Sequence, residues 1–191
     1  TSLGKALATY HFFSYQSNEA LHISDAERQV VLDCFSKIAF ELSQSMDKHS
    51  KKLITANIEL FLNYCVRFYD RQFISREHVN KGVLARFEEQ LNAYFLSDKP
   101  STLGLPSVAY FADQLHLSPN YFGDLIKRET GQAVKELIQN KLIEVAKELV
   151  FDGEKTVNEI AYELGFKYPQ HFTRLFKQRV GNTPMQFRNL N

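Results

Sequence analysis

Two stretches of the chain, residues 107–131 and 156–181, repeat one pattern of apolar, capping and turn residues. The first reads SVAYFADQLHLSPNYFGDLIKRETG and the second reads TVNEIAYELGFKYPQHFTRLFKQRVG. Matching residues lie 49 positions apart before the turn and 50 after it, as in Val108/Val157, Ala112/Ala161, Leu115/Leu164, Pro119/Pro169, Phe122/Phe172, Leu125/Leu175 and Gly131/Gly181. Each copy predicts a short helix, a tight turn and a second helix that ends at glycine, which is the plan of a helix-turn-helix.

The second copy carries the local signals of this plan most fully. Thr156 and Glu159 form a Thr-x-x-Glu capping box, in which each side chain satisfies a backbone N–H of the other residue. Gly165 stands at the turn, where a left-handed backbone favours glycine. The outer face of the helix that follows is predicted to carry Gln170, His171, Arg174 and Lys177. Amide, imidazole, guanidinium and ammonium groups are those that bond base edges and phosphates.

The first copy follows the same plan with weaker turn chemistry. His116 stands where Gly165 stands in the second copy, so a residue with a Cβ has to adopt the turn conformation. Ser118 is a suitable N-cap, and Pro119 follows it at the first helical position. The outer face is predicted to carry Asn120, Tyr121, Gly123, Asp124, Lys127 and Arg128. An asparagine pairs well with adenine and an aspartate accepts from cytosine, although an acid near phosphates is otherwise unfavourable.

The segment between the copies is predicted to be one long helix. Apolar residues recur at helical spacing from Val134 to Leu149, and Asp152 and Gly153 end the pattern. A helix over about residues 133–151 spans roughly 25–30 Å. One turn of DNA is about 34 Å long. A strut of this length suits two recognition helices that enter successive major grooves.

These features together resemble the DNA-binding domain of the AraC/XylS family of bacterial transcription regulators. The resemblance rests on the tandem motifs, the strut helix and the closing Gly-x-Thr-Pro-x-x-Phe-Arg run from Gly181 to Arg188. It implies an all-α chain, with residues 83–191 as a seven-helix tandem helix-turn-helix domain. It also implies a sequence-specific regulator, more often an activator, that binds double-stranded promoter DNA and contacts RNA polymerase. Residues 1–82 would be the helical linker and dimerisation region of an effector domain lying mostly upstream of Thr1, through which any small-molecule effector would act.

Position by position, the resemblance implies which side chains meet DNA. The base-reading places fall on Asn120, Gly123, Asp124, Pro169, Gln170, His171 and Arg174. The phosphate-contacting places are expected at Ser118, Tyr121, Lys127, Arg128, Tyr168 and Lys177. Gly123 has no side chain to read a base, and Pro169 has no donor. The first recognition helix is therefore expected to contribute DNA shape and phosphate contacts more than base readout.

The amino-terminal half predicts a helical hairpin. Ser24 and Glu27 form a capping box ahead of a helix over about residues 25–47, and a second apolar stripe follows from Ser50. A basic, polar stretch from Arg71 to Gly82 predicts a break before the next helix, and residues 97–107 predict a loop. Two helices cannot bury both of their faces alone, which favours a homodimer over plain hairpin packing. The expected dimer contacts are Phe35, Ile38, Leu42, Ile58, Phe61 and Leu62, with Phe40, Leu60 and Phe68 exposed beside them.

Composition and charge narrow the function classes. The net charge is only +1, so DNA binding has to depend on local clusters such as Lys127/Arg128 and Lys177/Arg179. Cys34 and Cys65 lie at apolar helical positions without metal-ligand spacing, which indicates buried thiols in a reducing cytoplasm. No nucleophile–base pair, phosphate loop, cofactor motif or membrane-spanning run is present, so an enzyme is the weakest reading. The alternatives are a helical protein-interaction module with a vestigial DNA surface, favoured by Gly123 and Asp124, and a duplicated helical core without any DNA role.

Overall fold

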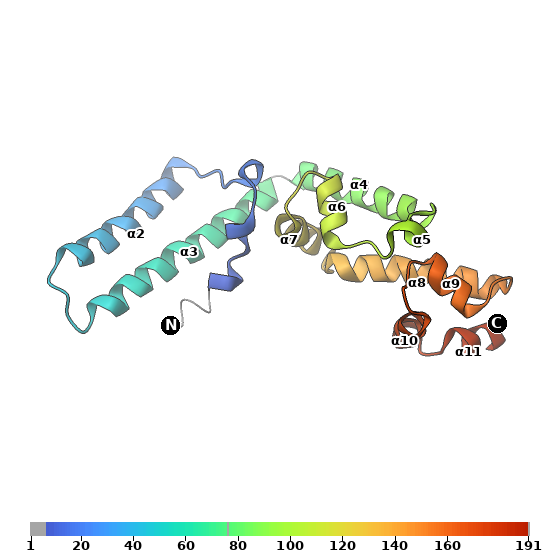
Figure 1. The fold of residues 1–191 in the computed structure, drawn as a ribbon. Coiled ribbons are helices and arrows are strands. Elements are labelled where there is room, and N and C mark those ends of the chain that lie inside the picture. Colours follow the sequence, from blue (N-terminus) through green and yellow to red (C-terminus); the bar gives the residue numbers. More distant parts are fainter. Residues whose placement is uncertain (1–6, 76, 191) are drawn as a thin grey trace. The chain divides into compact units, whose positions relative to one another are not determined.

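The computed structural model describes residues 7–75 and 77–190 (Figure 1). Every regular element within these residues is helical, which confirms the predicted all-α class. The chain folds into two compact units, residues 1–80 (unit 1) and residues 81–191 (unit 2). Among the described helices, none is both long and apolar enough to cross a membrane.

Unit 1 is a hairpin of two long helices with a short amino-terminal segment laid against it. Three single 3-10 turns, η1 (Leu7–Thr9), η2 (His11–Ser14) and η3 (Ser17–Glu19), precede α2 (Asp25–Ser43) and α3 (Ser50–Ser75). α2 and α3 pack against each other along their length (Figure 1). The predicted capping box starts α2, since Ser24 Oγ accepts from the Glu27 N–H at 3.3 Å and Glu27 Oε2 accepts from the Ser24 N–H at 2.8 Å.

The amino-terminal segment is fixed to α3 by the buried side chain of Gln72. Its Nε2 donates to the carbonyl of Ala20 at 3.1 Å, and its Oε1 accepts from the N–H of His22 at 2.7 Å. Arg71 adds a charged bond from Nε to Glu27 Oε1 at 2.7 Å and another from a terminal nitrogen to the carbonyl of His22 at 2.6 Å. A buried amide that uses both its donor and its acceptor costs little, so this clamp is stable.

Three local expectations for these regions were wrong. The described residues between Arg71 and Gly82 are helical instead of irregular, because α3 continues to Ser75 and α4 begins at Glu77. α2 ends at Ser43 rather than at residue 47, since Asp47 instead caps the next helix by accepting from the N–H groups of His49 and Ser50. Residues 97–107 contain a short helix, α5 (Lys99–Leu103), with a proline in its first turn.

Unit 2 holds most of α4 (Glu77–Phe95), then α5 and the two repeated motifs. α6 (Val108–Gln114) and α7 (Pro119–Thr130) form the first motif, and α9 (Val157–Glu163) and α10 (Pro169–Val180) form the second. α8 (Val134–Asp152) lies between them and confirms the predicted long helix, which ends at Gly153 with φ +76°. α11 (Pro184–Leu190) closes the chain (Figure 1). In this unit α8 contacts α7, α9, α10 and α11.

Each motif has an aromatic core of its own. In the first, Phe87 of α4 meets Phe111 and Phe122 edge to face, with both pairs of ring centroids 5.2 Å apart. In the second, Phe176 meets Phe172 at 5.7 Å and Phe187 at 5.6 Å. All but Phe187 are fully buried, and such edge-to-face pairs stabilise by about 0.5–1.5 kcal/mol beyond the burial of apolar area.

The turns of the two motifs have the same backbone. The N–H of Leu117 donates to the carbonyl of Ala112 at 2.9 Å, and the N–H of Phe166 donates to that of Ala161 at 2.9 Å. Between these bonded pairs, His116 has φ +56° and Gly165 has φ +87°. The first copy therefore does place a residue with a Cβ in the left-handed region, as its sequence predicts.

Candidate nucleic-acid interface

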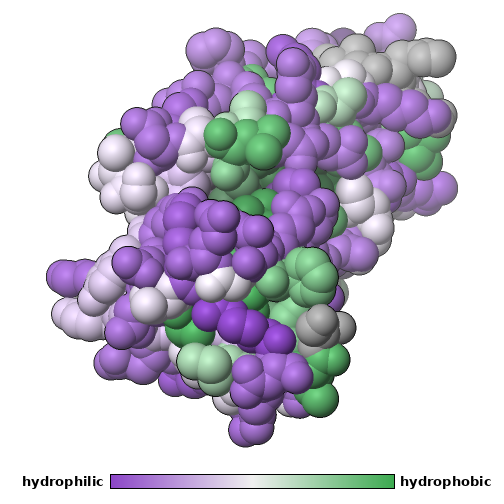
Figure 2. All heavy atoms as spheres, turned by 90° about the vertical axis from the view of Figure 1, so that its right-hand side faces the viewer, coloured by the Kyte–Doolittle hydropathy of each residue, from purple (hydrophilic) through white to green (hydrophobic). Residues whose placement is uncertain are grey.

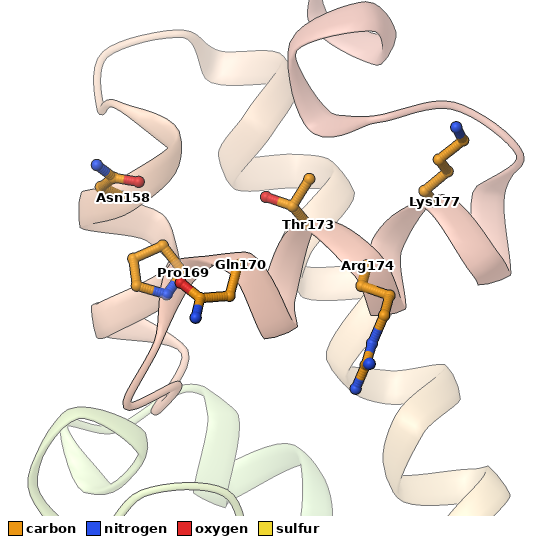
Figure 3. Close-up of a pocket in the computed structure, with 6 residues that line it drawn as sticks. All are labelled: Asn158, Pro169, Gln170, Thr173, Arg174 and Lys177. Carbon is orange, nitrogen blue, oxygen red and sulfur yellow. The ribbon is translucent and has the colours of Figure 1, made fainter.

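The exposed face of α10 forms an open groove with the start of α9. Six residues line a hollow of about 550 Å³: Asn158, Pro169, Gln170, Thr173, Arg174 and Lys177. Figure 3 shows Gln170 and Arg174 extending to the same side of α10, with Lys177 one turn further along. The side chains of Gln170, Arg174 and Lys177 are exposed. The groove is thus bordered by hydrogen-bond donors and two positive charges.

The ends of α10 are set by local signals. Tyr168 occupies the N-cap in an extended conformation, Pro169 takes the first helical position, and Gly181 ends the helix with φ +93°. Tyr168 is 48% exposed, with its ring edge-on to His171 at 5.6 Å and Lys167 Nζ 5.7 Å from its centroid. The beginning of α10 therefore presents an aromatic ring, an imidazole and an ammonium group together.

The face of α7 is less basic than that of α10. Asn120, Lys127 and Arg128 are exposed, at the two ends of the helix. Gly123 and Asp124 are only half-buried and lie between them. Ser118 caps the helix by accepting from the Tyr121 N–H at 3.2 Å, and Gly131 ends it with φ +72°. Asn120 and Asp124 occupy the places that Gln170 and Arg174 hold on α10.

Two residues expected to contact phosphates at this helix are buried. Tyr121 is 5% exposed and Ser118 is 3% exposed. The hydroxyl of Ser118 is used by the cap, and the ring of Tyr121 turns inward because burying its carbon atoms is more favourable than extending them into water. The outward placement of Tyr121 was therefore wrong, whereas the predicted N-cap role of Ser118 is confirmed. His171 stands at the position equivalent to Tyr121 and is exposed.

The two members of the predicted basic cluster Lys177/Arg179 lie on different sides of α10. Arg179 turns toward α8, where it donates to Oε1 of Gln139. Lys177 borders the groove, whereas Arg179 lines another hollow with residues of α8, including Asn140 and Lys147. Only Lys177 of this pair therefore belongs to the groove.

The closing run from Gly181 to Arg188 has a structural part. Thr183 caps α11 reciprocally with Gln186, with N···O distances of 2.9 and 3.3 Å. Arg188 donates from Nε to the carbonyl of Val150 at 2.9 Å and from a terminal nitrogen to the carbonyl of Lys155 at 2.7 Å. The run therefore ties α11 to the end of α8 and to the start of the second motif.

Three residues near the groove were not predicted from the sequence. Asn158 comes from α9, Thr173 is half-buried on α10 beside the groove, and Lys167 precedes α10. Asn158 follows the capping residue Thr156 by two positions, so its exposed side chain was recognisable, but its approach to α10 depends on how the two helices pack. The pKa of Glu159 is lowered, first because its carboxylate accepts from the Thr156 N–H. The carboxylate of Glu159 is therefore part of the helix cap of α9.

The hairpin leaves part of its apolar surface uncovered. On α2, Phe35 is 49% and Leu42 is 62% exposed. Ile38, Ile58 and Phe61 are half-buried, and the rings of Phe35 and Phe61 lie 4.9 Å apart. Leu62 and Phe68 are instead buried inside unit 1. The expected exposure of Phe68 was therefore wrong, and Leu62, expected as a dimer contact, is covered within its own unit. Both lie on the side of α3 that carries Cys65, which is buried as well.

No group of three or more His, Cys, Asp or Glu side chains is arranged to hold a metal ion in the described part of the chain. Cys34 and Cys65 are both free and buried. In the view of Figure 2, most of the surface is hydrophilic, and apolar atoms form small patches between polar ones.

Comparisons with known proteins agree on the second unit. The profile of a family described as "Helix-turn-helix domain" matches residues 111–190. The "Uncharacterized HTH-type transcriptional regulator YfiF" of Bacillus subtilis is 30% identical over 141 residues, which are 74% of this chain and 41% of that protein. The "Uncharacterized transcriptional regulatory protein YesN" of the same organism is 37% identical over 78 residues, covering 40% and 21%. The chain thus spans about two fifths or less of the length of these two relatives.

Solved structures agree on the fold. The C-terminal domain of AraT, a response regulator from Geobacillus stearothermophilus, is 26% identical with a TM-score of 0.51, covering 57% of this chain and 85% of that one. The C-terminal domain of the two-component response regulator yesN from Fusobacterium nucleatum has a TM-score of 0.50 at 22% identity, covering 56% and 98%. Residues 111–190 of this chain, which hold the end of the first motif, α8, the second motif and the Gly181–Arg188 run, therefore form a helix-turn-helix domain of the matched family, as the resemblance to the AraC/XylS regulators predicts.

Proposed function

We propose that this chain is a sequence-specific DNA-binding regulator of transcription that inserts α7 and α10 into successive major grooves. One observation carries the proposal: both second helices present exposed polar faces, and α8, with 19 residues, separates their motifs. At 1.5 Å per residue α8 is about 28 Å long. That length is near the rise of one DNA turn, about 34 Å.

The two helices are assigned different tasks. α10 reads bases through Gln170, His171 and Arg174, since an arginine bonds guanine O6 and N7 and a glutamine bonds adenine N6 and N7. α7 offers Asn120 for a base and Lys127 and Arg128 for phosphates. Because Gly123 has no side chain and Asp124 is half-buried, α7 contributes less to base selection than α10.

We further propose that regulation is positive and involves contact with RNA polymerase. The relative AdaA of Bacillus subtilis, named a "Bifunctional transcriptional activator/DNA repair enzyme", supports this sign; it is 31% identical over 80 residues, covering 42% of this chain and 38% of AdaA. Its shared segment is less than half of either protein. A reporter gene under a promoter that carries the selected site tests the sign directly: expression should rise with the chain present, and a fall would make it a repressor.

Selection of binding sites from a pool of random DNA tests the main proposal. The full 191-residue chain is expected to enrich sites with two conserved blocks about 10 base pairs apart, the block read by α10 being the more strongly conserved. Competition with unrelated DNA at fixed salt gives the specificity ratio. Enrichment of a single block would show that α7 does not contribute to base selection. No enrichment at all would favour the alternative, a protein-interaction module whose DNA surface is vestigial.

Unit 1 is proposed to pair with a second copy of itself. Leu32, Phe35, Ala39 and Leu42 recur on α2 at spacings of 3, 4 and 3 residues, which is the a/d spacing of helices that pack side by side. Leu32, Phe35 and Leu42 are all exposed. A stripe of this kind complements its own copy across a two-fold axis. Pairing would present two copies of unit 2 to paired DNA sites.

A further inference from the structure

The turn of the second motif is covered by the backbone of the segment ahead of the first motif. A Cβ built on Gly165 would lie 2.6 Å from the carbonyl oxygen of Pro100, 2.7 Å from the carbonyl carbon of Gly104 and 3.0 Å from its Cα. Main-chain atoms at such distances cannot move aside as a flexible side chain can. α5 accordingly packs on α9 (Figure 1). Gly165 thus allows two backbones to meet that any larger residue would keep apart.

The first motif shows that the turn itself does not need glycine. His116 makes the same turn with φ +56° and the same backbone hydrogen bond across it. Its side chain is exposed rather than covered. What distinguishes Gly165 is therefore the close approach of Pro100 and Gly104. Left-handed φ alone would have tolerated a histidine, at a modest cost in strain.

The covering segment is itself held by the first motif. The hydroxyl of Tyr94 on α4 donates to the carbonyl of Gly104 at 2.8 Å, and Tyr94 is buried. Its ring lies edge-on to those of Tyr110 and Phe111 of α6, with centroids 5.2 and 6.1 Å away. A continuous chain of contacts thus runs from α6 through Tyr94 and Gly104 to the turn between α9 and α10.

We propose that this clasp, formed by Tyr94, Pro100, Gly104 and Gly165, fixes the angle between the two motifs and so sets the spacing of the DNA blocks they read. α8 alone joins the motifs at its two ends, and a single helix permits bending and rotation of what it carries. A second connection through α5 and α9 removes that freedom. Gly165 is therefore a positioning residue. The claim about DNA spacing rests on the proposed function, whereas the claim that the clasp fixes the angle between the motifs is independent of that function.

Distance measurement between spin labels tests the structural half without DNA. Labels on cysteines placed at Asn120 and Gln170, in the full chain with Cys34→Ala and Cys65→Ala, report the separation of α7 and α10. The parent is expected to give one narrow distance, and Gly165→Ala a broadened or displaced one. Gly181→Ala is the matched control, because Gly181 has φ +93° but no atom within 4 Å of its added Cβ. An unchanged distance in a folded Gly165→Ala chain would overturn the clasp.

A gentler variant covers the case in which Gly165→Ala does not fold. Tyr94→Phe removes only the hydroxyl that bonds Gly104, and adds no atom. It is expected to broaden the distance less than Gly165→Ala does, while circular dichroism shows an unchanged helix content. If Tyr94→Phe keeps the parent's narrow distance and Gly165→Ala is unfolded, the proposed role of the clasp is likewise refuted.

Binding to the selected DNA tests the second half, using unlabelled chains. The parent is expected to lose at least about tenfold in affinity when one or two base pairs are inserted between the blocks, since both motifs must engage together. Compared with the parent, Gly165→Ala should bind the uninterrupted site at least about tenfold more weakly, but should bind a single α10 block with an affinity within about twofold. The inserted base pairs should also reduce the affinity of Gly165→Ala less than they reduce that of the parent. Equal loss on the site and on the single block would overturn the spacing role. If the parent does not select DNA, the proposed function is refuted, and the clasp is then tested by the spin-label distances alone.

Discussion

The guanidinium of Arg188 donates to the main-chain carbonyl of Val150 at the end of α8, across 2.9 Å. Its second bond, to the carbonyl of Lys155, reaches the loop that precedes α9. Arg188→Ala removes both charge-assisted bonds, so the free energy of unfolding of the chain should fall by about 1.5–3 kcal/mol. Urea unfolding measures the loss. Arg179→Ala, which removes a bond on the exposed side of α8, should change it by less than about 1 kcal/mol; similar losses for both variants would contradict a special role for Arg188.

Arg174 is expected to read one base. Replacing it with alanine should cost about 1–3 kcal/mol at a single base position and relax the preference there. Arg179→Ala serves as the control, because Arg179 donates to Gln139 of α8 and lies outside the groove. Affinities for the selected site and its single-base variants give the comparison. If Arg174→Ala weakens all DNAs equally, Arg174 contacts phosphate only.

Lys127 and Lys177 are expected to position the two helices on the phosphate backbone. Both are exposed at matching places on α7 and α10. Each lysine-to-alanine change should weaken all DNA sequences alike and lower the slope of log affinity against log salt by about one. Lys147→Ala on α8, whose side chain lines a different hollow, should leave the slope as it is. A slope unchanged in Lys177→Ala would place that lysine away from the DNA.

Sedimentation at micromolar concentration should show the chain as a dimer. Phe35→Glu and Leu42→Glu place a charge within the exposed stripe of α2, and burying such a charge in an interface is unfavourable, so both variants should sediment as monomers. Lys37→Glu adds an acid to another exposed face of α2 and should leave the dimer intact. A parent chain that is monomeric with a stable hairpin would refute pairing through unit 1.

Stability of unit 1 should depend on the thiol of Cys65 at high pH. Burial, and secondarily the neighbouring Cys34, raises the pKa of Cys65 from 9.0 to about 11. The folded state then holds this proton more tightly than the unfolded state, so the contribution is complete below pH 9 and is lost as the pH rises from 9 to 11. Unfolding free energies of the parent and of Cys65→Ala, compared across this range, should converge. Parallel curves would show that the thiol does not titrate in this way.

Signals that act within a few residues were sufficient for most of the helices. The capping boxes at Ser24 and Thr156 start α2 and α9, and Gly153 ends α8, where the sequence predicts. These interactions are local, so neighbouring residues determine them. The outward direction of Gln170 and Arg174 likewise follows from helical periodicity and an apolar face.

Side chains whose placement depends on distant neighbours were not predictable. Tyr121 is buried while His171, its counterpart in the second copy, is exposed, although both occupy the same place on their helices. Leu62 lies inside unit 1 because α3 is covered on that side, which apolar spacing alone does not reveal. Asn158 joins the groove only through the packing of α9 on α10. Periodicity identifies a face but not what covers it.

The shared turn of the two motifs implies an unequal mutational tolerance along a duplicated sequence. Positions 116 and 165 both have left-handed backbones, but the His116 side chain is exposed, whereas a Cβ added to Gly165 would lie 2.6 and 2.7 Å from main-chain atoms. Saturation mutagenesis should therefore find position 116 permissive and position 165 restricted to glycine. If the two copies arose from one motif, their sequences would diverge fastest at the turn position that no other backbone covers. A sequence search that requires glycine at the turn would therefore find the second copy and miss the first.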